Sequence, residues 1–153
     1  MALETQNRER TGILTRMTGT DWQALLDPDR RGLRLGPPAN VDDLASLEIQ
    51  IGHPVPADLR DLLSVANGFD DLAGQWQVAW DTERIVTENQ RMWRTAVIDS
   101  TRLAFGDNGA GDPFCLVLSG VDAGTVEERS PIDLDVTRSW PDLAAFWADW
   151  LAQ

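Results

Sequence analysis

Cysteine and histidine, the residues that most often build nucleophilic and metal sites, are almost absent from this sequence. It has one cysteine, Cys115, and one histidine, His53, so a disulfide within the chain and a histidine-rich metal site are both excluded. Cys115 stands inside the apolar run 114–118, which indicates a buried and inert thiol. His53 stands in the proline-bounded connection 53–56, so a nucleophilic Cys–His pair is not supported.

Long apolar runs and basic stripes are also missing. No apolar stretch approaches the roughly 20 residues that a membrane-spanning helix needs, and residues 1–12 hold no apolar segment of the kind found in signal peptides. We therefore expect no interaction with a membrane and a cytoplasmic location. Lysine is absent, and Arg30, Arg31 and Arg34 form the only basic cluster, which is too small for a nucleic-acid interface.

The charge that is present is strongly and unevenly negative. The net charge is −12 at pH 7. Residues 1–38 carry six arginines against five acids, whereas residues 39–153 carry seven arginines against twenty acids, a balance of −13. Such a surface repels the phosphates of nucleic acid and attracts basic partners. An excess of acid can also simply keep a protein soluble, so both explanations stay open.

The most clearly patterned stretch is residues 102–119. Two apolar runs, Leu103–Phe105 and Phe114–Leu118, flank the turn-forming segment 106–113. Short apolar runs bounded by turn residues predict a β-hairpin, and the second run lacks polar alternation, which indicates a strand buried on both faces at the centre of a sheet. Glycine supplies the backbone freedom that a sharp turn needs. The predicted structural turn residues are Gly106, Asn108, Gly109 and Gly111.

The rest of the chain alternates between helical and strand patterns. Capping residues and apolar spacing predict helices over about 20–26, 40–51, 56–66, 82–96 and 143–151, the last entered through Ser139–Asp142. Other patterns predict strands over 76–80, 124–129 and 132–137, a connection over 30–38 and an acidic loop from Phe69 to Asp71. This order indicates an α+β fold, a single domain with a mostly antiparallel central sheet and helices packed on it.

The helix predicted over 40–51 carries a carboxylate within its apolar face. Asn40 is the predicted N-cap, and Gly52 is the predicted stop. Glu48 falls within the apolar stripe, so its carboxylate needs an arginine or free backbone N–H groups as partners. We expect this role to be structural rather than catalytic. The apolar residues of the face are Val41, Leu44, Leu47 and Ile51.

No catalytic constellation stands out. The glycines of 106–111 precede a strand instead of opening a helix, so phosphate binding is not supported. Asp107, Asn108 and Asp112 could form a calcium loop, but the terminal glutamate and flanking helices of an EF-hand are missing. A turn whose side chains bond their own backbone is the simpler explanation. Nothing singles out a pair among the eighteen aspartates, so we expect no enzyme, no metal and no cofactor.

Several segments, in their order and spacing, resemble the SUKH superfamily, specifically its Smi/Knr-type branch. The resemblance covers roughly residues 33–151 and implies a division into an N-terminal lead-in with a short helix, 1–30, and a SUKH-like domain, 31–153. It further implies an α+β domain that binds other proteins and has no established catalytic residues. The segments that carry it are Leu35–Pro38, Leu44–Glu48, Ile51–Pro56, Leu59–Leu63, Asn67–Gly68, the helix with Asn89 and Trp93, and Phe105–Asp112.

The resemblance implies two functions. Many bacterial members of the superfamily look like immunity proteins that neutralise toxins, often basic nucleases, which would suit the acidic balance of this chain. Related fungal proteins act as non-catalytic scaffolds in cell-wall synthesis, which is the alternative. A small-ligand or metal-binding module at the 106–112 turn is a third hypothesis. For a basic cognate toxin, the candidate contact residues, chosen near predicted strand ends, are Asp70, Asp71, Trp76, Asp81, Asp107 and Asp112.

Overall fold

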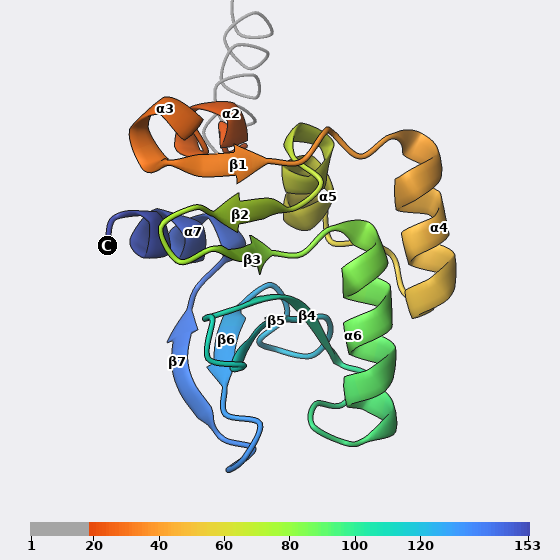
Figure 1. Ribbon diagram of the computed structural model, residues 1–153. Coiled ribbons are helices and arrows are strands. Elements are labelled where there is room, and N and C mark those ends of the chain that lie inside the picture. Colours follow the sequence, from red (N-terminus) through yellow and green to blue (C-terminus); the bar gives the residue numbers. More distant parts are fainter. Residues whose placement is uncertain (1–18) are drawn as a thin grey trace, which may run out of the picture.

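The computed structural model describes residues 19–153. Residues 1–18 of the lead-in predicted over 1–30 therefore lie outside the described residues. The described part is an α+β domain built on one antiparallel sheet of seven strands, as the sequence predicted (Figure 1). None of its helices is long and apolar enough to cross a membrane.

The strands follow one another in the sheet in the same order as in the chain. Each interior strand pairs with the strand before it and the strand after it in the chain. Most pairings are therefore made between segments that are close in sequence. The strands are β1 (Leu33–Leu35), β2 (Phe69–Asp71), β3 (Trp76–Ala79), β4 (Arg102–Asp107), β5 (Pro113–Val117), β6 (Val126–Arg129) and β7 (Val136–Trp140).

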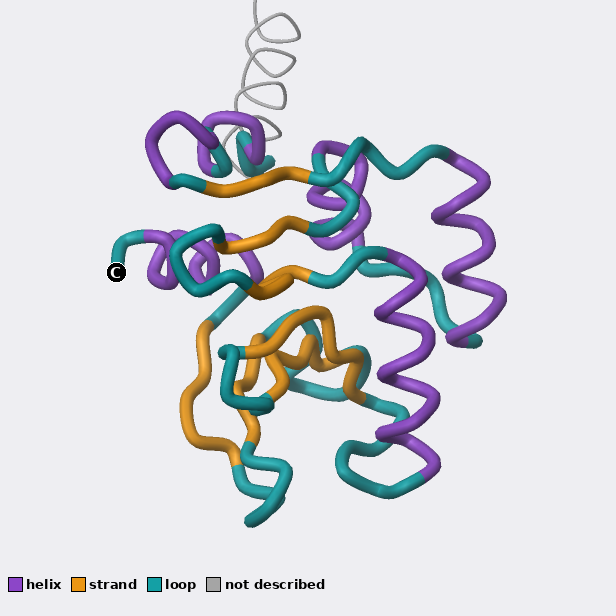
Figure 2. The backbone as a smooth tube through the Cα atoms, in the orientation of Figure 1, coloured by secondary structure: helices purple, strands orange, loops and turns teal. Residues whose placement is uncertain are grey.

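The helices lie before, between and after these strands (Figure 2). Three of the four longer helices begin at a side-chain cap. At the first of these, Asn40 accepts a hydrogen bond from the Asp43 N–H, and the Asp43 carboxylate accepts one from the Asn40 N–H. This reciprocal pair is a capping box, and Gly52 ends the same helix in the left-handed region, as predicted. The helices are α2 (Trp22–Leu25), α3 (Pro28–Arg31), α4 (Val41–Ile51), α5 (Ala57–Val65), α6 (Thr82–Arg94) and α7 (Leu143–Leu151).

The predicted hairpin is formed by β4 and β5, and every residue of β5 is buried. Because β5 pairs with β4 on one side and β6 on the other, its interior position is confirmed. Gly106 lies in β4 and not in the turn, which corrects its predicted place. A Cβ atom at this position would lie 2.2 Å from the Val78 carbonyl oxygen, so a side chain here would push β3 away.

Helix α7 covers one face of the sheet with aromatic rings. Phe146 contacts Phe114 with ring centroids 4.6 Å apart and Phe105 at 5.5 Å, and Trp147 contacts Phe69 at 4.8 Å. These partners come from β5, β4 and β2, so the helix spans the middle of the sheet. Burial of each large apolar side chain contributes roughly 1.5–3 kcal/mol. The aromatic stripe of the last helix is therefore core, as predicted.

Two segments predicted as a connection and a loop are strands, because strands of three residues give weak patterns. The predicted connection 30–38 contains β1, whose Arg34 pairs with Asp70 of β2; the predicted acidic loop at Phe69–Asp71 is thus a strand. The glycines and prolines around β1 favoured a connection over a strand, and the two aspartates of β2 favoured a loop. Strand pairing here is fixed by a contact between distant segments, which local pattern does not report.

The last strand and one helix face also differ from prediction. Residues 132–135 form a turn and loop, and β7 occupies Val136–Trp140, so the serine of the predicted Ser139–Asp142 helix start belongs to a strand. Asp142 is the N-cap of α7, accepting a hydrogen bond from the Ala145 N–H. Val41 is 81% exposed, whereas Leu44, Leu47 and Ile51 are buried, so Val41 is not part of the buried face predicted for α4.

Candidate protein-binding site

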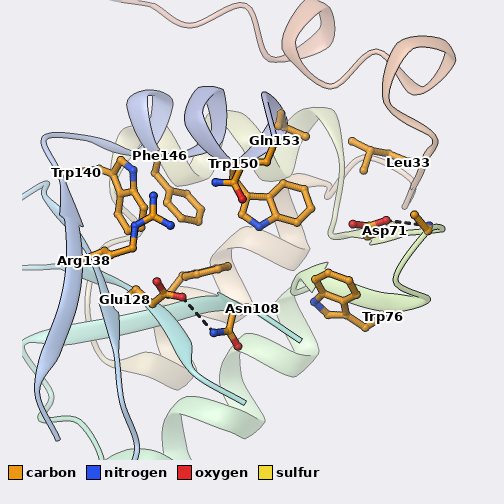
Figure 3. A pocket seen from close by; sticks show the side chains of 13 residues that line it. Leu33, Asp71, Trp76, Asn108, Glu128, Arg138, Trp140, Phe146, Trp150 and Gln153 are labelled. Carbon is orange, nitrogen blue, oxygen red and sulfur yellow. Dashed lines mark hydrogen bonds between the residues drawn. The ribbon is translucent and has the colours of Figure 1, made fainter. Parts of the chain in front are cut away.

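A cavity of about 440 Å³ opens between α7, β7 and the turn that joins β2 to β3 (Figure 3). Its lining includes three tryptophans and three charged side chains. They are Trp76, Trp140, Trp150, Asp71, Glu128 and Arg138.

The Trp76 ring is held between two turns. Its indole N–H donates to the Asp107 carbonyl oxygen at 3.3 Å. A Cβ atom on Gly109, in the β4–β5 turn, would lie 3.2 Å from this ring, and one on Gly74, in the β2–β3 turn, would overlap it. Both glycines therefore make room for the indole, which is fixed in place before any partner arrives.

Trp150 and Trp140 form the other walls. Trp150 lies edge-to-face against Trp76, with ring centroids 6.2 Å apart. The indole N–H of Trp140 donates to the Asp149 carboxylate at 2.9 Å. The Arg138 guanidinium lies 4.8 Å from the centre of the Trp140 ring and pairs with the same carboxylate at 3.0 Å. A cation on an indole face is thus already part of this wall.

Two carboxylates face the cavity from the sheet. Asp71 is directly across from Trp76 in the β2–β3 pairing, and it accepts hydrogen bonds from the backbone N–H groups of Ala73 and Gly74 at 2.9 and 3.2 Å. Glu128 accepts a hydrogen bond from the Asn108 amide at 3.2 Å. Within residues 32–153, neither carboxylate forms an ion pair with an arginine.

The structure brings only two of the six predicted contact residues, Asp71 and Trp76, to this cavity. Asp70 pairs with Arg34 at 2.6 Å. Asp81 is the N-cap of α6 and accepts a hydrogen bond from the Arg84 N–H at 2.8 Å. Because these carboxylates are engaged elsewhere in the fold, they are not part of the cavity's recognition surface.

Asp107 is only 8% exposed and serves the fold. Its carboxylate accepts hydrogen bonds from the Trp80 indole at 3.0 Å, the Gly109 N–H at 2.7 Å and the Arg84 guanidinium at 3.4 Å. The Arg84 guanidinium also lies 5.0 Å from the centre of the Trp80 ring. These contacts tie the start of the β4–β5 turn to α6 and leave the carboxylate turned away from solvent.

The polar side chains of the β4–β5 turn bond their own backbone. The Asn108 side-chain oxygen accepts hydrogen bonds from the N–H groups of Ala110 and Asp112 at 2.9 and 3.2 Å, and its amide donates to the Asp112 carboxylate at 3.0 Å. Gly109 and Gly111 have φ angles of +84° and +99°. Across residues 19–153, no group of three acidic, cysteine or histidine side chains is arranged to hold a metal ion.

Two buried or half-buried groups have the structural roles expected of them. Glu48 accepts a hydrogen bond from the Val55 N–H at 3.0 Å and forms an ion pair with Arg60, the two kinds of partner that the sequence required. Cys115 is fully buried, and this burial raises the pKa of its thiol to about 12. The thiol therefore stays protonated at neutral pH and is a poor nucleophile.

Sequence reasoning missed Trp140, Trp150, Glu128 and Arg138 as members of the site. Trp150 was assigned to the core, and it is in fact half-buried between the core and the cavity. The one local signal was the position of Trp150 near the end of α7, about one turn after Phe146 and Trp147 on the apolar stripe. The cavity itself joins Leu33 with segments from residues 71–76, 108–114 and 128–153, and no local pattern reports that meeting.

The fold and the cavity define a small α+β domain with a tryptophan-lined cavity. The family model of the SMI1 / KNR4 family (SUKH-1) matches residues 38–153. The chain belongs to this family, which confirms the resemblance seen in the sequence and points to interactions with other proteins. No match was found among curated proteins.

Proposed function

We propose that this chain is an immunity protein that neutralises a toxin by binding it directly and covering its active site. The observation that carries the proposal is the cavity, in which three preformed indole walls lie beside two carboxylates that have no arginine partner in residues 32–153. Tryptophan is the residue most enriched among those that dominate binding energy in protein interfaces.

The charge of the chain supports a basic partner. Residues 39–153 carry a balance of −13, and a net charge of this size speeds the encounter with a positively charged protein. Toxins that cleave nucleic acid need positive charge in their active sites to bind phosphates. An acidic protein can cover such a site, and we place this encounter in the cytoplasm.

The proposed mechanism is steric and electrostatic, without catalysis. The cavity lining contains no serine, threonine, cysteine or histidine, and Cys115 is buried with a raised pKa. Neutralisation would then require one immunity protein for each toxin molecule. Stoichiometric protection is a measurable consequence of this mechanism.

The test is to co-express the chain with the C-terminal domain encoded by its neighbouring gene. We expect rescue of growth and capture of that domain at low salt, with weaker capture at high salt. The variant Trp76→Ala should lose capture, whereas Ile49→Ala, an 80% exposed position on α4, should keep it. Capture at neither salt concentration would overturn this pairing and favour a scaffold role in cell-wall synthesis.

A further inference from the structure

We infer that the cavity receives an arginine side chain of the partner, with its guanidinium between the indole walls and the two carboxylates. The inference rests on the proposed function, because the side chain belongs to the protein that is bound. It goes further by naming the chemical group that the cavity recognises.

The first argument is the pairing of the acidic residues. Asp70 and Asp71 are adjacent in β2, and Glu127 and Glu128 are adjacent in β6, so in each pair the side chains point to opposite faces of the sheet. Asp70 pairs with Arg34, and Glu127 pairs with both Arg102 and Arg129 at 3.0 Å. The cavity-facing member of each pair has no such arginine within residues 32–153, so these arginines leave its negative charge unbalanced.

The second argument is Arg138, the one basic side chain within residues 32–153 that lines the cavity. It lies across from Glu128 in the β6–β7 pairing, yet its guanidinium stacks on Trp140 and pairs with Asp149. Its charge is therefore balanced outside the cavity. The same contact shows that a guanidinium can lie over one of the cavity's indoles, an arrangement worth about 0.5–1 kcal/mol when exposed and more when water is excluded.

The third argument excludes other occupants. An apolar side chain would dehydrate Asp71 and Glu128 without giving either carboxylate a partner, which is costly. An acidic side chain would meet like charge. A guanidinium can pair with either carboxylate and has a planar apolar face for tryptophan. The cavity volume of about 440 Å³ leaves room for one long side chain and water.

The test uses a short probe peptide, acetyl-Gly-Arg-Gly-amide, and records the indole N–H signals of the ¹⁵N-labelled protein by NMR. We expect saturable shifts of the Trp76, Trp140 and Trp150 signals, with a dissociation constant on the order of millimolar. Trp93 lies on α6, outside the cavity lining, and its indole donates to the Arg102 carbonyl oxygen. Its signal should therefore not move. The same peptide with citrulline, which is neutral and has nearly the same shape, should give no shifts.

Two matched double variants separate the cavity from the overall charge. Asp71→Asn with Glu128→Gln keeps the hydrogen-bond acceptors of both side chains and should weaken peptide binding about fivefold. Asp61→Asn with Asp133→Asn removes the same charge at exposed positions outside the cavity lining and should leave binding within about twofold, because separated surface charges are screened. Equal weakening by both variants would overturn the inference.

Three other outcomes would also overturn the inference: equal shifts with the citrulline peptide, shifts confined to Trp93, or no shift at about 50 mM peptide, well above a millimolar dissociation constant. The result is independent of the toxin. If the peptide binds as stated but no toxin is captured, only the immunity proposal fails. If a toxin is captured and neutralised but the peptide leaves the cavity signals unchanged, only the arginine inference fails.

Discussion

The Asn89 side chain hydrogen-bonds both backbone groups of Ala104. Its oxygen accepts from the Ala104 N–H and its amide donates to the Ala104 carbonyl oxygen, each at 2.7 Å. Strand β3 leaves β4 after Trp80, whose N–H donates to the Phe105 carbonyl oxygen, so Ala104 has no strand beside it there. The amide replaces the missing strand, and Trp93, one helical turn later, does the same for the Arg102 carbonyl oxygen.

Replacing this amide by an apolar group of similar size, Asn89→Leu, should strongly destabilise the fold. Asn89 is fully buried, and its loss leaves two backbone groups of Ala104 without partners, each costing about 1–3 kcal/mol. We expect a loss of about 3 kcal/mol in the free energy of unfolding, measured by urea denaturation. Gln90→Ala, an exposed change on the same helix, should cost less than about 0.5 kcal/mol; similar losses for both variants would contradict this role.

A second prediction concerns the turn beneath Trp76. Gly109→Ala places a Cβ atom 3.2 Å from the Trp76 ring at a φ of +84°, so it adds both backbone strain and a displaced indole. Gly111→Ala meets nothing within 4 Å at a φ of +99° and adds strain alone. Both should lose about 1–2 kcal/mol of stability, but only Gly109→Ala should shift the Trp76 indole signal and weaken partner binding. An unchanged Trp76 signal in Gly109→Ala would refute the supporting role of this glycine.

Much of this fold follows from local chemistry in the sequence. The capping box at Asn40, the stop at Gly52 and the buried hairpin strand Pro113–Val117 each depend on residues within one turn or one strand. Polar residues on apolar faces were also informative, because burial obliges them to find partners. Glu48 found the predicted N–H and arginine, and Asn89 lies on the buried face of its helix.

The edges of the sheet and the cavity could not be predicted in the same way. β1 is three residues long, and its pairing with β2 depends on a register between segments far apart in the chain. The cavity depends on the same long-range geometry, since its indoles come from β3, β7 and α7. In the sequence, a tryptophan that lines a cavity and one that fills a core look alike.

The single thiol gives a third prediction. Because Cys115 is buried in β5 and its pKa is raised to about 12, a thiol reagent such as iodoacetamide should not modify the folded protein at pH 8. Full modification is expected once urea unfolds the chain, and the unfolded sample is the positive control. Rapid modification under native conditions would show that β5 opens readily, which would contradict its interior position.

The last prediction concerns pH and the first turn of α5. Burial, followed by repulsion from Asp142 and Asp61, raises the pKa of Asp58 above its ordinary value of 3.8. The folded state therefore holds this proton more tightly than the unfolded state does. The resulting stability is fully present below pH 3.8 and is lost as the pH rises through the raised pKa.

Asp58→Asn removes a charge that the folded state disfavours at neutral pH. The variant should be more stable than the parent at pH 7, by less than about 1 kcal/mol because the site is largely exposed, and the difference should vanish at about pH 3, where Asp58 is protonated. Thermal unfolding at both pH values measures this, with the exposed Asp133→Asn as the control. The helix dipole favours an acid at this position, so a less stable variant at pH 7 would mean that the dipole outweighs repulsion and burial.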